Sequence, residues 1–213
     1  VNLALTPEQV GLSLREVGLG FMFAPNHHPA MRHAAPVRKE LGMRTILNIL
    51  GPLTNPAGAP NQVMGVFHPD LVGIQARVLQ MLGSRHVLTV HGADGLDEIT
   101  LTGPTHVAEL RNGSIAEYVL EPGQFGIATA PIEAIQVPGP DEARARVLSV
   151  LANEPGPSSD VVVLNAAAAL YVAGVAGSLS DGVRLAGETI ASGAARACLD
   201  RLVAFTGSLA RPG

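Results

Sequence analysis

The sequence predicts an α/β fold, in which helices flank a mixed, mostly parallel sheet. The apolar runs 63–67 and 86–90 are typical of buried strands, and they flank a helical pattern over 69–82 that Gly83 ends. Such a β-α-β unit requires parallel strands joined by a right-handed crossover. From residue 141 onward the pattern is helical, so helices are expected to cover the sheet.

A hairpin is expected after this unit. Asn112-Gly113 lies between the apolar runs 105–110 and 115–120, and an Asn-Gly pair favours the tight turn in which both central residues are left-handed. The helices that follow are expected over 141–152, 160–173 and 181–205, the last with a break near Gly193.

The N-terminal residues contain a helix start. Thr6 can cap the helix, Pro7 suits its first turn and Gln9 completes a capping box. Gly18 offers the stop. Residues 21–23, Phe-Met-Phe, are then expected to form a short buried strand or a packed turn.

Residues 29–56 are expected to form a helical segment that projects toward a small α-domain. A helix should open at Pro29, bend at Pro36 and run toward Gly42, and a short helix over 45–50 should end at Gly51-Pro52. The expected division of the chain is therefore 1–28 as the entry into an α/β domain, 29–56 as this helical segment, and 57–213 as the main α/β domain.

Composition narrows the functional class. The 213 residues are 47% apolar, yet no apolar run approaches the roughly 18–20 residues that span a bilayer, and no charged-then-apolar leader opens the chain. The single cysteine, Cys198, fits a reducing compartment, so we expect a cytoplasmic protein. A formal charge of −4 and 3% aromatic residues argue against nucleic acid as a partner.

An acidic pair, Asp97-Glu98, follows the expected strand 86–90 in a glycine-containing loop. The carboxyl ends of strands in open α/β sheets are where ligands bind. Adjacent carboxylates suit Mg²⁺, a hard cation that keeps waters and substrate phosphates as further ligands. The alternative is an acidic pair that is merely solvated. Asp94, earlier in the loop, is expected to shape the turn.

Two residues could bind a carboxylate or an amine: His28, just before the segment 29–56, and Arg38, within it. His28 precedes the expected helix at Pro29, where its neutral imidazole would be favoured. The alternative, which the spacing alone favours, is that it caps the helix and packs against Phe23. Arg38 could bind a carboxylate through two parallel hydrogen bonds, or simply pair with Glu40 on a solvated face.

Four stretches of the sequence resemble one family, the anthranilate phosphoribosyltransferases. They are FMFAPNHHPAMRHAAPVRKELGMRTILNILGPLTNP at 21–56, HGADGLDE at 91–98, NAAAALYVAGVA at 165–176 and LVAFTG at 202–207. The resemblance covers nearly the whole chain. It implies the C-terminal domain of the nucleoside phosphorylase and phosphoribosyltransferase type, and the transfer of phosphoribosyl from 5-phosphoribosyl diphosphate to anthranilate.

The resemblance also implies roles for particular residues. The anthranilate site would comprise His28, Arg38, Met31, Pro25, Ala24 and Pro52, and Asp97 and Glu98 would bind Mg²⁺. The family's small-molecule partners, anthranilate and 5-phosphoribosyl diphosphate, would be the substrates. No membrane partner is implied, and the full-length protein would be a homodimer.

One departure from the family concerns the N-terminal side. The family begins with a helical region and a glycine-rich phosphate loop, and neither occurs in these 213 residues. We therefore expect this chain alone to be inactive. Two alternatives stay open on this basis: a catalytically incomplete fragment or binding module, and an enzyme similar to the pyrimidine nucleoside phosphorylases.

Overall fold

The computed structural model describes residues 1–27, 40 and 49–209, and it divides into two compact units. One unit comprises Val1–Asn48 with Gly193–Gly213, and the other comprises Ile49–Ser192. The expected helix from Pro29 toward Gly42, and most of the short helix over 45–50, lie outside the described residues.

The first unit contains the N-terminal helix that the sequence predicts. Helix α1 spans Pro7–Val17, and its capping box is complete: the Thr6 hydroxyl accepts from the Gln9 amide, while the Gln9 side chain accepts from the Thr6 amide. Gly18 ends the helix in the left-handed conformation. The helix start and stop are therefore confirmed.

The region after α1 corrects one expectation. Residues 21–23 form neither a strand nor a buried turn, and Phe21 and Phe23 are 49% and 39% exposed. A single helical turn, α2 (Ala24–His27), follows them. Three aromatic or apolar residues in a row carry no periodicity, so the pattern cannot tell a buried run from a connecting one.

The second unit holds the sheet, whose strand order is β1-β2-β3-β4. The strands are β1 (Asn61–Gly65), β2 (His86–Gly92), β3 (Thr105–Arg111) and β4 (Ser114–Leu120). Strand β1 runs parallel to β2, with α5 (Leu71–Met81) between them in sequence, so the β-α-β unit is confirmed. The other two neighbouring pairs are antiparallel, which makes the sheet mixed but not mostly parallel in the described residues.

The hairpin between β3 and β4 forms at the predicted residues. Asn112 and Gly113 both have positive φ, 52° and 76°, as a two-residue turn with two left-handed positions requires. The register pairs Arg111 with Ser114 directly across the turn.

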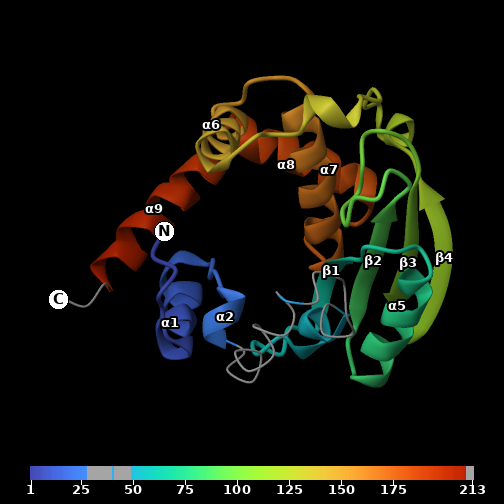
Figure 1. Cartoon of the computed structure of the whole chain (residues 1–213), viewed down its shortest axis with the longest axis horizontal. Coiled ribbons are helices and arrows are strands. Elements are labelled where there is room, and N and C mark those ends of the chain that lie inside the picture. Colours follow the sequence, from blue (N-terminus) through green and yellow to red (C-terminus); the bar gives the residue numbers. More distant parts are fainter. Residues whose placement is uncertain (28–39, 41–48, 210–213) are drawn as a thin grey trace. The chain divides into compact units, whose positions relative to one another are not determined.

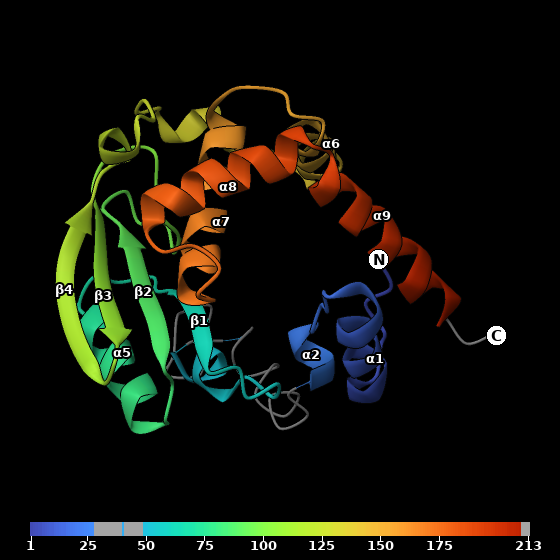
Figure 2. The ribbon, with the colours of Figure 1, turned by 180° about the vertical axis from the view of Figure 1, so that it is seen from behind.

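Helices cover both faces of the sheet, as Figures 1 and 2 show from opposite sides. Helix α5 packs on one face, over Met64, Val87 and Leu110. Helix α7 (Pro157–Val172) packs on the other, with α6 (Pro140–Leu151) and α8 (Leu179–Ala191) beside it. Short 3-10 turns lie at Gly51–Thr54 (η1), Pro122–Phe125 (η2) and Ile132–Ala134 (η3).

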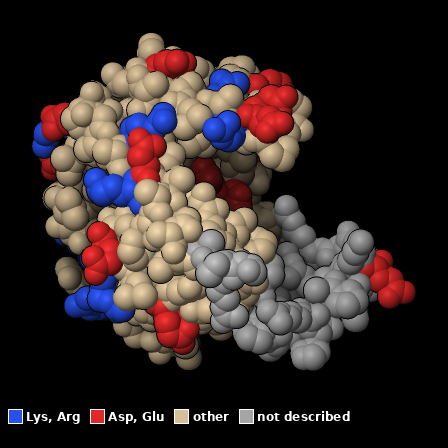
Figure 3. Space-filling model, turned by 90° about the vertical axis from the view of Figure 1, so that its left-hand side faces the viewer, with Lys and Arg blue, Asp and Glu red and all other residues tan. Residues whose placement is uncertain are grey.

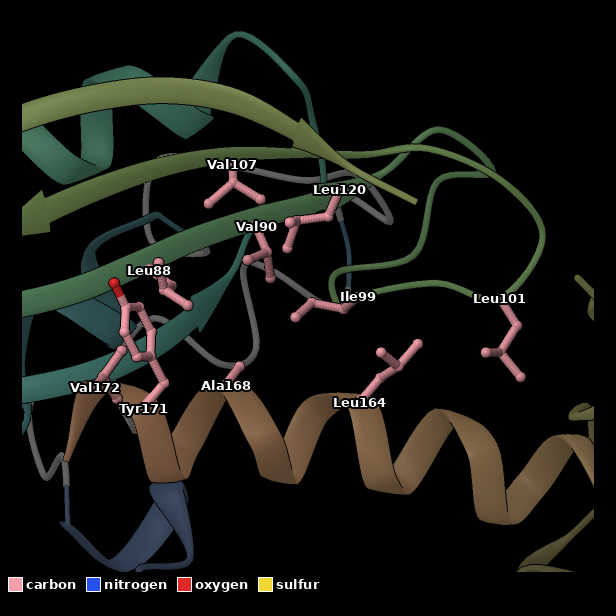
Figure 4. Close-up of a cluster of buried hydrophobic side chains, with 10 residues drawn as sticks. All are labelled: Leu88, Val90, Ile99, Leu101, Val107, Leu120, Leu164, Ala168, Tyr171 and Val172. Atoms are coloured by element: carbon pink, nitrogen blue, oxygen red, sulfur yellow. The ribbon is translucent and has the colours of Figure 1, made fainter. Parts of the chain in front are cut away.

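The contact between α7 and the sheet forms the larger of the two cores, shown in Figure 4. Leu164, Ala168 and Tyr171 recur at helical spacing on one side of α7, so they share the face that meets the sheet. Leu88 and Val90 point at them from β2 (Figure 4). Because successive side chains of a strand alternate, Val87 faces α5 instead, and β2 is buried on both faces.

Helix α8 lies unusually close to α7, at Gly182. A Cβ atom added to Gly182 would lie 2.7 Å from the carbonyl oxygen of Ala167 and 3.0 Å from its Cβ. Small residues on both helices therefore allow the two backbones to approach, and α7 is held by α8 as well as by the sheet.

The C-terminal helices separate where the sequence predicts. Gly193 is left-handed, with φ 75°, and divides α8 from α9 (Ala194–Ser208). Helix α9 belongs to the first unit, where the Gln9 side chain donates to the Leu209 carbonyl at 3.2 Å. Packing between the two ends of the chain leaves no local signal in the sequence. The expected division into 1–28, 29–56 and 57–213 stays a prediction, since most of 29–56 lies outside the described residues.

Two surface properties bear on partners. No helix in the described part of the chain is long and apolar enough to span a bilayer. On the face shown in Figure 3, acidic and basic side chains alternate and neither sign forms a continuous field.

We predict that Gly182→Ala will destabilise the second unit. The added methyl group meets backbone atoms of α7 that cannot rotate away, and overpacking of this kind costs about 1–3 kcal/mol. Chemical denaturation followed by circular dichroism measures the change in the free energy of unfolding.

Gly187→Ala is the matched control, because the same helix has open space there. Replacing glycine by alanine inside a helix normally stabilises it by about 0.5–1 kcal/mol. Equal effects of the two substitutions would contradict the close approach of α7 and α8.

Candidate functional site

The loop between β2 and β3 carries the acidic pair, at the carboxyl end of the only parallel strand pair among the described residues. Gly65 at the end of β1 pairs with Val90, so both strands finish at the same edge of the sheet. The Ala93 amide donates to the Pro104 carbonyl at 2.9 Å, which closes the base of the loop. Asp97 and Glu98 therefore lie where open α/β sheets bind ligands.

Asp94 shapes the first turn of this loop, as the sequence predicts. One carboxylate oxygen accepts from the Leu96 amide at 3.1 Å, and the other accepts from the hydroxyls of Thr100 at 2.6 Å and Thr102 at 2.8 Å. Partial burial raises the pKa of Asp94, but these hydrogen bonds outweigh it and hold the pKa below its usual range. The Asp94 carboxylate therefore stabilises the loop itself.

Gly92, the last residue of β2, and Gly95 in the loop serve the same turn. The Gly92 amide donates to the Leu96 carbonyl at 2.9 Å, and the Gly95 amide donates to the Gly92 carbonyl at 2.8 Å. Gly95 has φ 95°, a conformation that side chains rarely adopt.

Gly65 of β1 packs against the backbone of the loop at Asp97, a contact that the sequence did not predict. A Cβ atom added to Gly65 would overlap the carbonyl group of Asp97, so the backbone of Asp97 rests directly on β1. Only glycine leaves room for this approach. A glycine at the end of an expected strand is a weak signal of such a contact, because the partner lies far along the sequence.

Asn165 of α7 binds the backbone of Ile99, the residue that follows Glu98. The sequence did not predict this contact either. Its side-chain oxygen accepts from the Ile99 amide at 3.0 Å, and its nitrogen donates to the Ile99 carbonyl at 2.9 Å. The available signal was a single polar residue in the alanine-rich run 165–169.

The carboxylates of Asp97 and Glu98 are exposed and lie side by side in sequence. Although Glu98 is exposed to solvent on one side, protein atoms surround part of its carboxyl group. This partial burial, together with the neighbouring charge of Asp97, raises the pKa of Glu98. A bound cation would relieve both effects. Across the described residues no group of three or more histidine, cysteine or acidic side chains gathers, so a cation here would take its further ligands from water or a phosphate, as Mg²⁺ does. The donor set therefore fits Mg²⁺.

The predicted anthranilate residues are spread over both units. Ala24 and Pro25 lie in α2, and Pro52 lies exposed in η1. His28, Met31 and Arg38 lie outside the described residues. The structure therefore neither brings these six residues together nor separates them.

The sequence matches the family described as "Glycosyl transferase family, a/b domain" over residues 1–196. The chain belongs to this family. Curated relatives in it include the anthranilate phosphoribosyltransferases of Laribacter hongkongensis and Chromobacterium violaceum. Each is 62% identical to the chain, over 99% and 98% of its length. The chain spans 61% of the length of each of these relatives.

Solved structures similar to this chain agree with the sequence relatives. The anthranilate phosphoribosyltransferase of Thermus thermophilus is 48% identical, with a TM-score of 0.90, over 96% of this chain and 61% of that one. The enzyme of Saccharomyces cerevisiae in complex with PRPP and Mg is 28% identical, with a TM-score of 0.86, over 96% and 59%. The resemblance seen in the sequence is confirmed, and so is the expected α/β class with a mixed sheet flanked by helices.

We predict that Gly65→Ala will displace the loop over residues 93–104, between β2 and β3, which carries Asp97 and Glu98 and is called the acidic loop below. The new methyl group cannot share space with the Asp97 carbonyl, so the loop must lift from β1. We expect the amides of Gly92 and Leu96, which close the turn, to exchange their hydrogens about tenfold faster or more, equivalent to about 1.4 kcal/mol of local stability.

Gly103→Ala serves as the control, because it lies in the same loop with nothing near its added methyl group. Hydrogen exchange read by NMR compares the two variants. Unchanged protection at Gly92 and Leu96 in Gly65→Ala would show that the loop does not depend on β1.

Proposed function

We propose that the complete protein is an anthranilate phosphoribosyltransferase. It would transfer phosphoribosyl from 5-phosphoribosyl diphosphate to the amine of anthranilate, giving N-(5-phosphoribosyl)anthranilate and diphosphate, in tryptophan biosynthesis. The observation that carries this proposal is the 62% identity, over 99% of the chain, to a relative of that name. Because the chain spans 61% of that relative, the proposal concerns the whole protein.

Asp97 and Glu98 would hold the metal of this reaction. Mg²⁺, when bound, supplies positive charge that neutralises the leaving diphosphate. Support comes from the exposed carboxylate pair at the carboxyl end of β2, and from the yeast neighbour, which is described in complex with PRPP and Mg. Two protein carboxylates leave room for the phosphate oxygens in the coordination shell.

Arg38 and His28 would bind and aim anthranilate. A planar guanidinium matches a carboxylate through two parallel hydrogen bonds, so Arg38 suits the acid group of this substrate. His28 would orient the amine, and Ala24, Pro25, Met31 and Pro52 would form apolar walls around the ring. This part of the proposal rests on the resemblance of 21–56 to the family.

Catalysis would then follow from position and charge. The aromatic amine is a competent nucleophile once the ribose C1 carries oxocarbenium character, so the reaction does not require a strong base. Holding the amine in line with C1 removes much of the entropic barrier of a two-substrate reaction. The names of the relatives favour this reaction over that of a pyrimidine nucleoside phosphorylase.

The cellular setting is proposed on the same grounds. A tryptophan-biosynthetic enzyme with one cysteine would work in the cytoplasm. We also propose that the complete protein is a homodimer, which the family resemblance supports.

We predict that Arg38→Ala will weaken anthranilate binding far more than binding of 5-phosphoribosyl diphosphate. The lost charge-assisted hydrogen bonds are worth about 1.5–3 kcal/mol, or roughly 10- to 150-fold in the dissociation constant. Calorimetric titration of the complete protein with each substrate measures the two losses.

Arg38→Lys is the matched control, since it keeps the charge but cannot form the bidentate pair, and it should recover little of the affinity. Equal losses for both substrates, or full recovery by lysine, would remove Arg38 from the anthranilate site.

We predict that Asp97→Asn with Glu98→Gln will abolish Mg²⁺-dependent binding of 5-phosphoribosyl diphosphate. Neutral amides bind Mg²⁺ poorly because the cation requires charged or strongly polar oxygen ligands. The free energy of unfolding should change by less than about 1 kcal/mol, since both side chains are exposed.

Glu188→Gln with Asp200→Asn removes two exposed carboxylates away from the loop, so it matches the change in net charge and should bind as the unmodified protein does. Persistent Mg²⁺ dependence in the double variant would mean that the metal binds elsewhere.

A further inference from the structure

The Asn165 side chain, from α7, makes two hydrogen bonds to the backbone that directly follows the acidic pair. Its amide oxygen accepts from the Ile99 amide, and its nitrogen donates to the carbonyls of Ile99 and Val161, the latter at 2.9 Å. The amide can face Ile99 in one orientation only, because a flipped side chain would set donor against donor. Asn165 thus pairs with Ile99 in both directions, as a neighbouring strand would.

This pairing fixes the residue next to Glu98. Ile99 is 3% exposed and packs in the same core cluster as Leu164 and Ala168 of α7. A loop residue buried at this depth must have partners for its backbone groups, and no strand supplies them here. Asn165 supplies both, so the end of the acidic pair follows the position of α7.

The residue before the pair is fixed by different contacts. The Leu96 amide donates to Asp94, and its carbonyl accepts from the Gly92 amide. Asp97 and Glu98 therefore lie between two pinned neighbours, Leu96 and Ile99. Two like charges at adjacent positions repel each other, and a free loop would let them separate. A backbone held at both ends keeps them in place before any cation arrives.

We propose that Asn165 is a positioning residue for the metal site: it holds the Ile99 backbone so that Asp97 and Glu98 stay preorganised to bind a divalent cation. This inference rests on the proposed function, since it assigns Asn165 to the site at Asp97 and Glu98. The side-chain amide of Asn165 is hydrogen-bonded to the backbone of Ile99 and Val161, so it would act on the metal ligands through Ile99. Residues that orient metal ligands from behind typically change metal affinity by 10- to 100-fold when they are replaced.

The test uses the complete protein and Mn²⁺ as a paramagnetic probe for the Mg²⁺ site. Electron paramagnetic resonance counts free Mn²⁺, so a titration gives the dissociation constant without any assay of turnover. We expect Asn165→Ala to weaken Mn²⁺ binding about tenfold or more. The unfolding free energy of each variant is measured in parallel.

Tyr171→Phe is the control on the same helix. The Tyr171 hydroxyl donates to Glu109 at 2.8 Å and accepts from Arg111 at 2.7 Å, so the substitution breaks a buried network without touching Ile99. It should destabilise the protein and leave the Mn²⁺ affinity within about twofold. If Tyr171→Phe weakened Mn²⁺ binding as much as Asn165→Ala did, general destabilisation would explain the effect and the proposal would fall.

Asn165→Asp separates positioning from electrostatics and covers a failure of the alanine variant to fold. It keeps the acceptor for the Ile99 amide but sets a carboxylate against the carbonyls of Ile99 and Val161. The added negative charge alone would strengthen cation binding. Weaker Mn²⁺ binding in this variant therefore supports displacement of the loop, and tighter binding overturns the proposal.

Failure of this inference can be told apart from failure of the proposed function. Mn²⁺ binding by the unmodified protein that Asp97→Asn with Glu98→Gln abolishes, together with normal binding by Asn165→Ala, removes only the positioning role. Absence of Mn²⁺ binding by the unmodified protein removes the metal site itself, and the positioning role with it.

Discussion

The packing of α7 against β2 is the contact on which the rest of the second unit depends. Leu88 and Val90 meet Ala168 and Val172 across this interface, and the alanine lets the helix lie close to the strand. Burying apolar surface on both faces of β2 fixes the strand in the middle of the structure. The acidic loop begins where β2 ends, so the position of the loop depends on the packing of this core.

A polar network secures the same helix at the opposite end of the sheet. Tyr171 and Tyr118 both donate to Glu109, and His86 lies 3.0 Å from that carboxylate. Burial and the negative charge of Glu109 raise the pKa of both phenols, so they stay protonated as donors. Asn165 binds the loop at one point along α7 and Tyr171 binds the strands at another. The helix therefore connects the polar network at one end of the sheet with the loop of Asp97 and Glu98 at the other.

Local signals made much of the fold predictable. The Thr6 capping box, the Asn112-Gly113 turn and the break at Gly193 each depend on residues adjacent in sequence, and each formed as expected. The pairing of Asn165 with Ile99 joins residues 66 positions apart, and no local pattern encodes it. The same holds for the approach of Gly65 to Asp97, and for the grouping of α9 with α1. The carboxylate pair can thus be read from the sequence, while the contacts that hold its backbone in place can be read only from the fold.

The most direct test of this account is a crystal structure of the complete protein with Mg²⁺ and 5-phosphoribosyl diphosphate. The account predicts Mg²⁺ at about 2.0–2.1 Å from carboxylate oxygens of Asp97 and Glu98, or joined to them through a single water, with diphosphate oxygens completing an octahedral shell. The Ile99 backbone should remain paired with Asn165 in that complex. Mg²⁺ bound to the diphosphate away from both carboxylates would contradict the account.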